Sequence, residues 1–289
     1  MITKQVTTFF LILGFFNSFF AQQTGRDINS LQLTFQNSNK YKKIKKALKD
    51  PEMVYELNIK VSKNQEYLSY LSSFHNLKII RVIVDKEINL TELFFDISKI
   101  NTLYELSIEG ENLTILPDVF ENMQNLKILS ISKTKLTELP NSICTIKNLE
   151  LLGVCCNNLN TLPDSIGKLH LLKYLNVQSN KISKIPVSVS NLEKLRYLDL
   201  SDNSMETLPE SICTIKNLEE LFLYENLLDN LPNCFKNLEN LFYLRLDNNE
   251  FINIPPPLYK MKSLNNTDLR RNEISIDERN NYYYIEMTR

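Results

Sequence analysis

The residues best suited to catalysis or metal binding are few in this chain of 289 residues. There are two histidines, His75 and His170, and five cysteines, Cys144, Cys155, Cys156, Cys213 and Cys234. Zinc sites are typically built from closely spaced cysteines such as CxxC, or from clustered cysteine and histidine, and neither pattern occurs. The odd number of cysteines also gives no paired disulfide framework. The adjacent Cys155 and Cys156 could form a reactive thiol site, although chance adjacency is the simpler interpretation.

Nucleotide-binding and hydrolytic chemistry also lack their sequence signatures. Glycine is scarce, at 5 residues, and neither GxGxxG nor GxxxxGK followed by Ser or Thr is present. The pattern implies no acidic or nucleophilic partner for either histidine. The formal net charge of -1 gives no electrostatic basis for binding nucleic acid or an acidic membrane. We therefore expect a protein that is not an enzyme, with no catalytic residues, no metal, no cofactor and no nucleic-acid partner.

Apolar residues recur with a fixed period along most of the chain. The interval between unit starts is 23 residues, except for one of 26, and the units begin at Val54, Leu77, Leu103, Leu126, Leu149, Leu172, Leu195, Leu218, Leu241 and Leu264. We number positions within each unit from these residues as position 1. Such a period is typical of a solenoid, in which one unit buries its apolar face only against its neighbours.

Positions 4 and 6 of each unit are apolar and alternate with polar residues, as in Leu198 and Leu200. This alternation predicts a short strand whose side chains at positions 4 and 6 point inward. Apolar residues at positions 11, 14, 18 and 21 fill the core as the chain turns and returns. Stacked units then form one parallel sheet with strands about 4.8 Å apart.

Two further positions carry a constant polar or turn-forming residue. Position 9 is asparagine in six successive units, at Asn157, Asn180, Asn203, Asn226, Asn249 and Asn272. Its amide offers both a donor and an acceptor to backbone groups at the bend after the strand, and we expect the column of amides to link one unit to the next. Position 15 is proline in seven units, at Pro117, Pro140, Pro163, Pro186, Pro209, Pro232 and Pro255. Proline fixes φ and predicts a turn followed by a short helix or 3₁₀ stretch on the convex side.

One block of units is duplicated within the chain. Residues 142–150 and 211–219 share the sequence SICTIKNLE and lie 69 residues apart, which is three units of 23. Cys144 and Cys213 are therefore copies of one position. At about 4.8 Å per unit they are about 14 Å apart, too far to form a disulfide with each other.

The consensus LxxLxLxxNxLxxLPxxIxxLxx resembles the typical 23-residue leucine-rich repeat of Ras-group scaffold and plant disease-resistance proteins. The low glycine content and the export signal described below make it similar to a secreted bacterial member of that family. The resemblance implies an α/β solenoid, a horseshoe with a concave parallel β-sheet and convex short helices or 3₁₀ turns. It also implies recognition of a protein on the concave sheet.

The chain ends differ from the repeats. Residues 1–21 combine Lys4 with a short apolar stretch and a small exit residue, Ala21, which predicts a Sec-type signal peptide or, alternatively, a retained anchor. Residues 22–53 form an N-terminal flank in which Asn39 caps a helix ending near Pro51. About ten repeat units occupy residues 54–275, and residues 276–289 fold over the last unit as a C-terminal cap. We expect no stable membrane span after signal removal and no catalytic domain after Arg289.

Positions 3, 5 and 7 of each strand are expected to face outward on the concave side. There the sequence gathers aromatic and charged residues of the kind enriched at protein interfaces, namely Tyr174, Tyr197, Asp199, Phe222, Tyr224, Tyr243, Arg245 and Asp247. The alternative is that the tyrosines only cover the sheet.

The sequence predicts an exported protein–protein interaction module whose partner binds the concave sheet. We expect it to be secreted, periplasmic or on the cell surface, and monomeric. A cell-surface adhesin or glycan-binding protein is the first alternative, because aromatic rings can stack on sugars. An intracellular signalling scaffold is the second, and it applies if residues 1–21 are not a signal.

Overall fold

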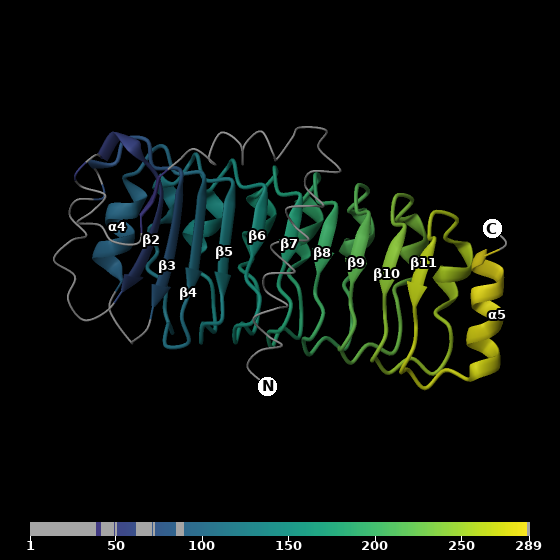
Figure 1. Ribbon diagram of the computed structural model, residues 1–289. Coiled ribbons are helices and arrows are strands. Elements are labelled where there is room, and N and C mark those ends of the chain that lie inside the picture. The colour runs from purple at the N-terminus through teal and green to yellow at the C-terminus, as the bar shows by residue number, and fades with distance from the viewer. Residues whose placement is uncertain are drawn as a thin grey trace.

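A computed structural model describes residues 39–41, 49, 51–61, 71, 73–84 and 90–287. Within these residues, eleven parallel strands form one sheet in which spatial order follows sequence order (Figure 1). Helix α4 and the 3₁₀ segments between successive strands lie behind this sheet, so each unit runs along a strand and returns on the other side, and α5 stands at the C-terminal end. The predicted α/β solenoid is confirmed. The signal-peptide prediction for residues 1–21 lies outside the described residues.

The strands are longest near the start of the solenoid and shorten to three residues later on. They are β1 (Asn39–Tyr41), β2 (Val54–Val61), β3 (Ile79–Val84), β4 (Glu105–Glu109), β5 (Ile128–Ser132), β6 (Leu151–Gly153), β7 (Tyr174–Asn176), β8 (Tyr197–Asp199), β9 (Glu220–Phe222), β10 (Tyr243–Arg245) and β11 (Asn266–Asp268). Two α-helices are described, α4 (Thr91–Ser98) and α5 (Ile276–Met287). The 3₁₀ segments are η1 (Pro51–Met53), η3 (Phe120–Asn122), η4 (Asn141–Thr145), η5 (Ile166–Lys168), η6 (Val187–Asn191), η7 (Glu210–Thr214), η8 (Asn233–Asn237) and η9 (Pro256–Lys260).

From β2 onward, strand register reproduces the repeat position by position. Leu175 of β7 pairs with Leu198 of β8, which pairs with Leu221 of β9, all at position 4. These leucines are fully buried, as are their neighbours at position 6. Parallel pairing without shift means that residues at one position form a column running along the sheet.

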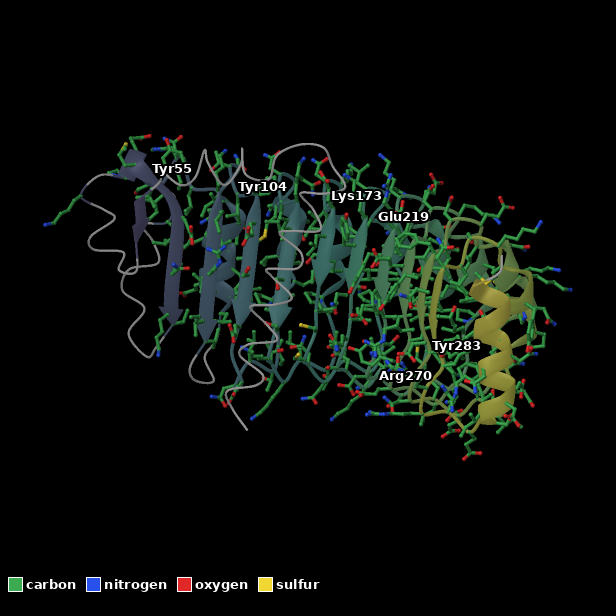
Figure 2. The ribbon with its side chains drawn as sticks, turned by 45° about the vertical axis from the view of Figure 1, so that its right-hand side comes forward. Tyr55, Tyr104, Lys173, Glu219, Arg270 and Tyr283 are labelled. Atoms are coloured by element: carbon green, nitrogen blue, oxygen red, sulfur yellow. A yellow bond between two sulfur atoms is a disulfide. The ribbon has the colours of Figure 1, made fainter. Side chains whose placement is uncertain are left out.

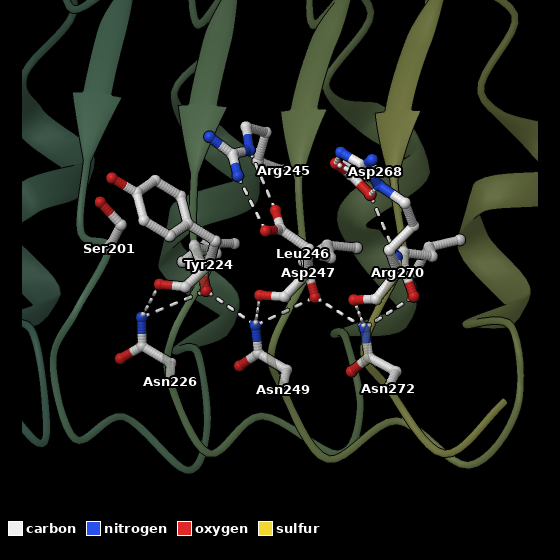
Figure 3. A network of polar contacts seen from close by, with 12 residues as sticks. Ser201, Tyr224, Asn226, Arg245, Leu246, Asp247, Asn249, Asp268, Arg270 and Asn272 are labelled. Atoms are coloured by element: carbon white, nitrogen blue, oxygen red, sulfur yellow. Dashed lines mark hydrogen bonds and ion pairs between the residues drawn. The ribbon is translucent and has the colours of Figure 1, made fainter.

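The asparagines at position 9 bond the backbone of two units at once. The Asn226 amide donates to the carbonyls of Leu200 (2.9 Å) and Leu223 (3.2 Å), and its Oδ1 accepts from the amide N–H of Met205 at 3.0 Å. Figure 3 shows Asn226, Asn249 and Asn272 in a row beneath the strands, each amide nitrogen donating to backbone carbonyls. The predicted column is real, but its members join the units through backbone groups and not through one another.

The residue before each asparagine has a left-handed backbone, which the repeat consensus did not reveal. Position 8 has φ between 51° and 58° in seven successive units, at Lys133, Cys156, Ser179, Asp202, Glu225, Asn248 and Arg271. None of these is glycine, so each of these seven units carries a conformation that L-residues adopt at some cost. In six of them the hydrogen bonds of the following asparagine stabilise the bend, and in the seventh Thr134 follows Lys133.

The prolines at position 15 begin the 3₁₀ turns, as the sequence predicted. Pro140 is extended, with φ -64° and ψ 141°, and its carbonyl accepts from Ile143 at 3.2 Å to open η4. The unit with 26 residues instead contains α4, whose Leu93, Phe94 and Ile97 are buried. The ring of Phe94 lies 5.9 Å from that of Phe120 in the next unit. The insertion thus replaces a 3₁₀ turn with a helix.

A column of charged and aromatic side chains runs along the edge where the strands begin. Position 2 carries Tyr55, Tyr104, Lys173 and Glu219, which Figure 2 shows in a row along this edge. Within the column Glu150 accepts from Lys127 (2.8 Å) and Lys173 (2.7 Å). Burial alone would raise the pKa of Glu150, but hydrogen bonds from these two lysines lower it. The pairs link consecutive units and favour the observed register.

The N-terminal flank differs from its prediction at Asn39–Tyr41. These residues form strand β1, which pairs in parallel with β2, and they are not the first turn of a helix. An unpaired edge strand exposes a row of backbone donors and acceptors, and β1 satisfies those of β2. Edge pairing here outweighs the helical pattern of the sequence, which is a weak local preference. Residues 42–48 and 50 lie outside the described residues.

At the other end, α5 covers the last unit. Tyr282 is fully buried, 5.6 Å from the ring of Tyr259. In interior units the backbone N–H at position 6 donates to a backbone carbonyl of the next strand, as the Leu246 N–H does to the Asp268 carbonyl at 2.8 Å. Leu269 has no next strand, and its N–H donates to the Tyr283 hydroxyl at 3.0 Å instead. The cap therefore supplies the hydrogen bond that a further repeat would make.

Cys213 and Cys234 form a disulfide, which corrects the expectation that the cysteines make no pair. Their Cα atoms are 5.8 Å apart, on the neighbouring turns η7 and η8. The two residues are 21 positions apart, two fewer than one repeat, because the turns pack with a two-residue offset. The bond joins position 19 of one unit to position 17 of the next, whereas the distance expected from the sequence concerned Cys144 and Cys213, which share position 19.

Candidate functional site

The alternation of the strands places all eight sequence-predicted residues on the concave face, the sheet face opposite the buried leucines. Their exposure differs from expectation. Tyr174, Asp199 and Asp247 are buried, with exposed fractions of 2%, 4% and 6%, and the other five are partly buried. The patch is therefore a packed layer on the sheet, in which the side chains contact one another before any partner arrives.

Four aromatic rings form a continuous row across β7 to β10. Ring centroids are 6.2 Å apart between Tyr174 and Tyr197, 5.1 Å between Tyr197 and Phe222, and 5.3 Å between Phe222 and Tyr243. The rings are tilted by 39–40°, a geometry favourable for aromatic pairs. We call Tyr197, Phe222 and Tyr243 the aromatic triad. The structure thus brings together residues that the sequence placed at two different positions of the unit.

The row depends on Phe222 because the tyrosine column is interrupted. Position 3 is Tyr174, Tyr197 and Tyr243 on three of four strands, but Glu220 stands between the last two. Phe222 lies two residues further along β9 on the same face, and its ring bridges the gap. Sequence reasoning did not single out Glu220, although the break in the column was its signal.

Glu220 is a buried carboxylate with no partner. Its exposed fraction is 9%, and among the described residues no hydrogen bond or ion pair reaches its carboxylate. Burial, and secondarily the charge of Glu219, raises the pKa of Glu220 from 4.5 to about 7. Charges without partners are costly to bury, so this residue costs stability when it ionises.

Asp199, by contrast, is fully hydrogen-bonded. Its Oδ1 accepts from the Ser201 backbone N–H at 3.0 Å and from the Ser201 hydroxyl. Its Oδ2 accepts from the Tyr197 hydroxyl at 3.3 Å and from the Asn176 amide at 3.5 Å. Burial raises the pKa of Asp199, and these hydrogen bonds oppose that rise. Asp199 therefore fixes the sheet face and orients Tyr197.

Tyr224 and Arg245 form a second cluster at position 7 and position 5. The Tyr224 hydroxyl accepts from the Gln178 side chain at 2.5 Å, passing over the small Ser201 on the strand between them. The Arg245 guanidinium lies 4.2 Å from the Tyr224 ring centroid and donates two bonds to Asp247, at 2.9 and 2.8 Å (Figure 3). This is a cation held by an aromatic face and a carboxylate.

Arginines on both sides of this region are paired in similar ways. Arg270 donates three side-chain bonds to Asp268, the shortest at 2.6 Å, at the C-terminal end of the sheet. Near the other end, Arg81 donates to Glu56 and, at 2.9 Å, to Glu105 on the flanking strands. Each of these arginines pairs with a carboxylate, whereas no cation among the described residues reaches Glu220.

Sites for other chemistry are weaker. Cys155 is buried and Cys156 is exposed at the left-handed bend. A hydrogen bond with the Cys155 thiol lowers the pKa of Cys156 to about 7, whereas the same contact and burial raise that of Cys155. His75 contacts Glu52 at 2.9 Å on the exposed surface.

In the described part of the chain, no group of three or more His, Cys, Asp or Glu residues is placed to hold a metal ion. No helix among those residues is long and apolar enough to cross a membrane.

Two family profiles match the second half of the chain. Residues 147–205 match the profile described as leucine rich repeat, and residues 187–281 match that described as leucine-rich repeat region. No curated protein matches the sequence.

Solved structures with the same architecture come from bacteria and plants. A leucine-rich-repeat protein of Leptospira interrogans is 28% identical with a TM-score of 0.68, over 82% of this chain and 66% of that one. An internalin of Listeria monocytogenes is 23% identical with a TM-score of 0.60, over 75% and 61%. The ectodomain of an Arabidopsis thaliana membrane receptor kinase, in complex with CASPARIAN STRIP INTEGRITY FACTOR 2, is 21% identical with a TM-score of 0.55, over 77% and 33%. The chain spans at most about two thirds of the length of these structures.

Proposed function

The chain is a leucine-rich-repeat protein, and we propose that it is an exported, non-enzymatic module that binds a protein partner on its concave face. Leucine-rich repeats are generally interaction modules, and one solved structure of this fold is a complex with CASPARIAN STRIP INTEGRITY FACTOR 2. The observation that carries the proposal is the row of four aromatic rings on β7 to β10. Packed aromatic residues beside an arginine are typical of interface hot spots.

The packing within the row favours a protein over a sugar as the partner. Each ring of the aromatic triad contacts its neighbour at 5.1 or 5.3 Å, so part of each face is already covered. A stacked sugar needs the whole of a ring face, whereas side chains of a protein can contact the part of each ring that its neighbour leaves open. A rigid layer also loses little conformational freedom on binding, which favours affinity.

Export is supported by the disulfide between Cys213 and Cys234. Structural disulfides persist in oxidising compartments and are rare in the cytosol. Together with the apolar start of the sequence, this favours a secreted, periplasmic or cell-surface protein, here proposed as bacterial and monomeric. Mass spectrometry of the exported protein tests this. A processed N-terminus is expected, whereas an intact Met1 in the cytoplasmic fraction contradicts export.

Binding on the concave face is tested by comparative affinity capture. The double variant Phe222→Ala, Tyr243→Ala removes two rings of the row. The control, Val187→Ala with Ile252→Ala, removes exposed apolar side chains away from the strands. We expect a partner that the wild type and the control retain and the double variant loses, with unchanged circular dichroism. Equal capture by all three proteins rejects the concave face as the binding surface.

A further inference from the structure

Two groups of side chains on the concave face each combine aromatic rings with a carboxylate, but only one of them includes a cation. In the first, the Arg245 guanidinium lies 4.2 Å from the ring of Tyr224 and donates twice to the Asp247 carboxylate. In the second, the aromatic triad stands beside the Glu220 carboxylate, which no cation among the described residues contacts. The first group shows that such an arrangement holds a cationic side chain, which is what the second group would bind.

Strand register brings the members of the second group together. Glu220 pairs directly with Tyr197 on β8 and with Tyr243 on β10, so the three side chains leave the sheet on the same face. Phe222 leaves that face two residues later, and its ring touches the rings of both tyrosines. The rings thus meet over β9, the strand that carries Glu220. This accounts for the 9% exposure of its side chain.

The charge balance of the surrounding face also requires a positive partner. Asp247 and Asp268 are each paired with an arginine, Arg245 and Arg270. Asp199 has no ion pair within the described part of the chain but accepts hydrogen bonds from Ser201, Tyr197 and Asn176. Glu220 has neither an ion pair nor a hydrogen bond to its carboxylate from any residue that the structure describes. A carboxylate buried against apolar rings is stabilised most by a cation that approaches over those rings, because ring faces and carboxylate both attract it.

We propose that Glu220 and the aromatic triad form a receptor for one cationic side chain, a lysine or arginine, of the protein that binds the concave face. This inference rests on the proposed function, since it names the chemistry of that partner. The cation lies over the ring faces and reaches the carboxylate from the open side of the sheet. This cation gives Glu220 an ion pair. Asp247 and Asp268 on the same face already have ion pairs within the chain, and Asp199 has hydrogen bonds instead.

Isothermal titration calorimetry on the full chain tests the receptor. The probes are two end-blocked peptides with alternating serine and lysine, one with free lysines and one with every lysine acetylated. Acetylation removes the charge and keeps most of the length. We expect the free-lysine peptide to bind about tenfold more tightly than the acetylated one, a difference of about 1.4 kcal/mol. Equal affinity for both peptides overturns the proposal.

Variants locate the effect. Glu220→Gln keeps the size of the side chain and is expected to abolish the preference for free lysine. Glu250→Gln removes the same charge from an exposed position and is expected to retain the preference. Phe222→Leu keeps an apolar residue but removes one ring face, and a several-fold loss of the preference is expected. An equal loss in the Glu220 and Glu250 variants means general attraction to an acidic protein and contradicts a specific receptor.

The affinity capture described above separates this inference from the proposed function. A partner lost by the Phe222→Ala, Tyr243→Ala variant and also by Glu220→Gln supports both. A partner lost by the aromatic variant but retained by Glu220→Gln at wild-type level leaves the binding surface in place and rejects the cation receptor.

Discussion

Replacing Glu220 with glutamine should stabilise the protein at high pH and have little effect at low pH. The folded protein holds the pKa of this carboxyl at about 7, against 4.5 ordinarily, because burial and the charge of Glu219 oppose its ionisation. The folded state therefore retains a proton that the unfolded state has lost. Stability from this group is fully present below pH 4.5 and is lost as the pH rises through 7.

The difference of about 2.5 pKa units sets an upper limit of about 3 kcal/mol for the stability lost above the folded pKa. Water still reaches part of the carboxyl group and screens its charge, so about half of this loss is expected. Most of it falls between about pH 5 and about pH 8.5, so the free energy of unfolding of Glu220→Gln relative to wild type should rise by about 1 kcal/mol over this interval.

Urea denaturation followed by circular dichroism measures this difference, because urea adds no ions that would screen the charges. Other titrating groups cancel in the comparison of the two proteins. The matched variant Glu250→Gln removes an exposed carboxylate and should show no such trend. A difference between wild type and Glu220→Gln that is the same at both pH values refutes the assignment of Glu220 as a buried, unpartnered carboxyl.

Three further predictions concern the repeat itself. Asn226→Leu leaves the Met205 N–H unbonded at a buried bend and removes one of two asparagine donors from the carbonyls of Leu200 and Leu223, which keep their bonds from Asn203 and Asn249, so urea denaturation should show a loss of about 1–3 kcal/mol. Ser165 lies 21 residues after Cys144, the separation of the bonded pair in the duplicated block, so Ser165→Cys should form a second disulfide, and a thiol assay should find two free thiols in the variant against three in the wild type. Ser179 has φ 55°, so Ser179→Gly should leave the melting temperature unchanged or higher, whereas Ser179→Ile should lower it by several degrees.

The features that could be predicted from sequence are those set by the period. A core leucine such as Leu198 must face inward, and the units must stack in register, because no unit can bury its apolar face alone. The roles of the asparagine at position 9 and the proline at position 15 were predictable for a related reason. The asparagine bonds backbone groups at the bend and the proline fixes φ before the 3₁₀ turn, and these requirements recur along the repeats. These inferences needed no knowledge of how neighbouring side chains touch.

The features that could not be predicted depend on contacts between units. The disulfide of Cys213 with Cys234 requires the offset between adjacent 3₁₀ turns, which the consensus does not contain. Strand β1 forms because β2 has an open edge, a tertiary demand with no local sequence signal. The burial of Tyr174, and of Glu220 beside the triad, follows from how side chains of neighbouring strands lean on one another. Residue type alone had suggested that the tyrosines would be exposed.

The chain's own bonding pattern points to where its function lies. At the bends, on the strand edge and under the terminal helix, polar groups find partners within the protein, down to the Tyr283 hydroxyl that replaces a missing strand for Leu269. Stability would favour the same outcome at position 3 of β9, where a tyrosine would complete the column between Tyr197 and Tyr243. The chain instead holds a glutamate there at a cost to stability. The buried hydroxyls of Ser188 and Ser211 also have no hydrogen-bond partner among the described residues, but an unpaired hydroxyl costs far less than an unpaired charge. Residues that reduce stability in this way are typical of functional sites. A partner that brings a cation to Glu220 would recover that cost on binding, so the same residue would weaken the free protein and strengthen the complex.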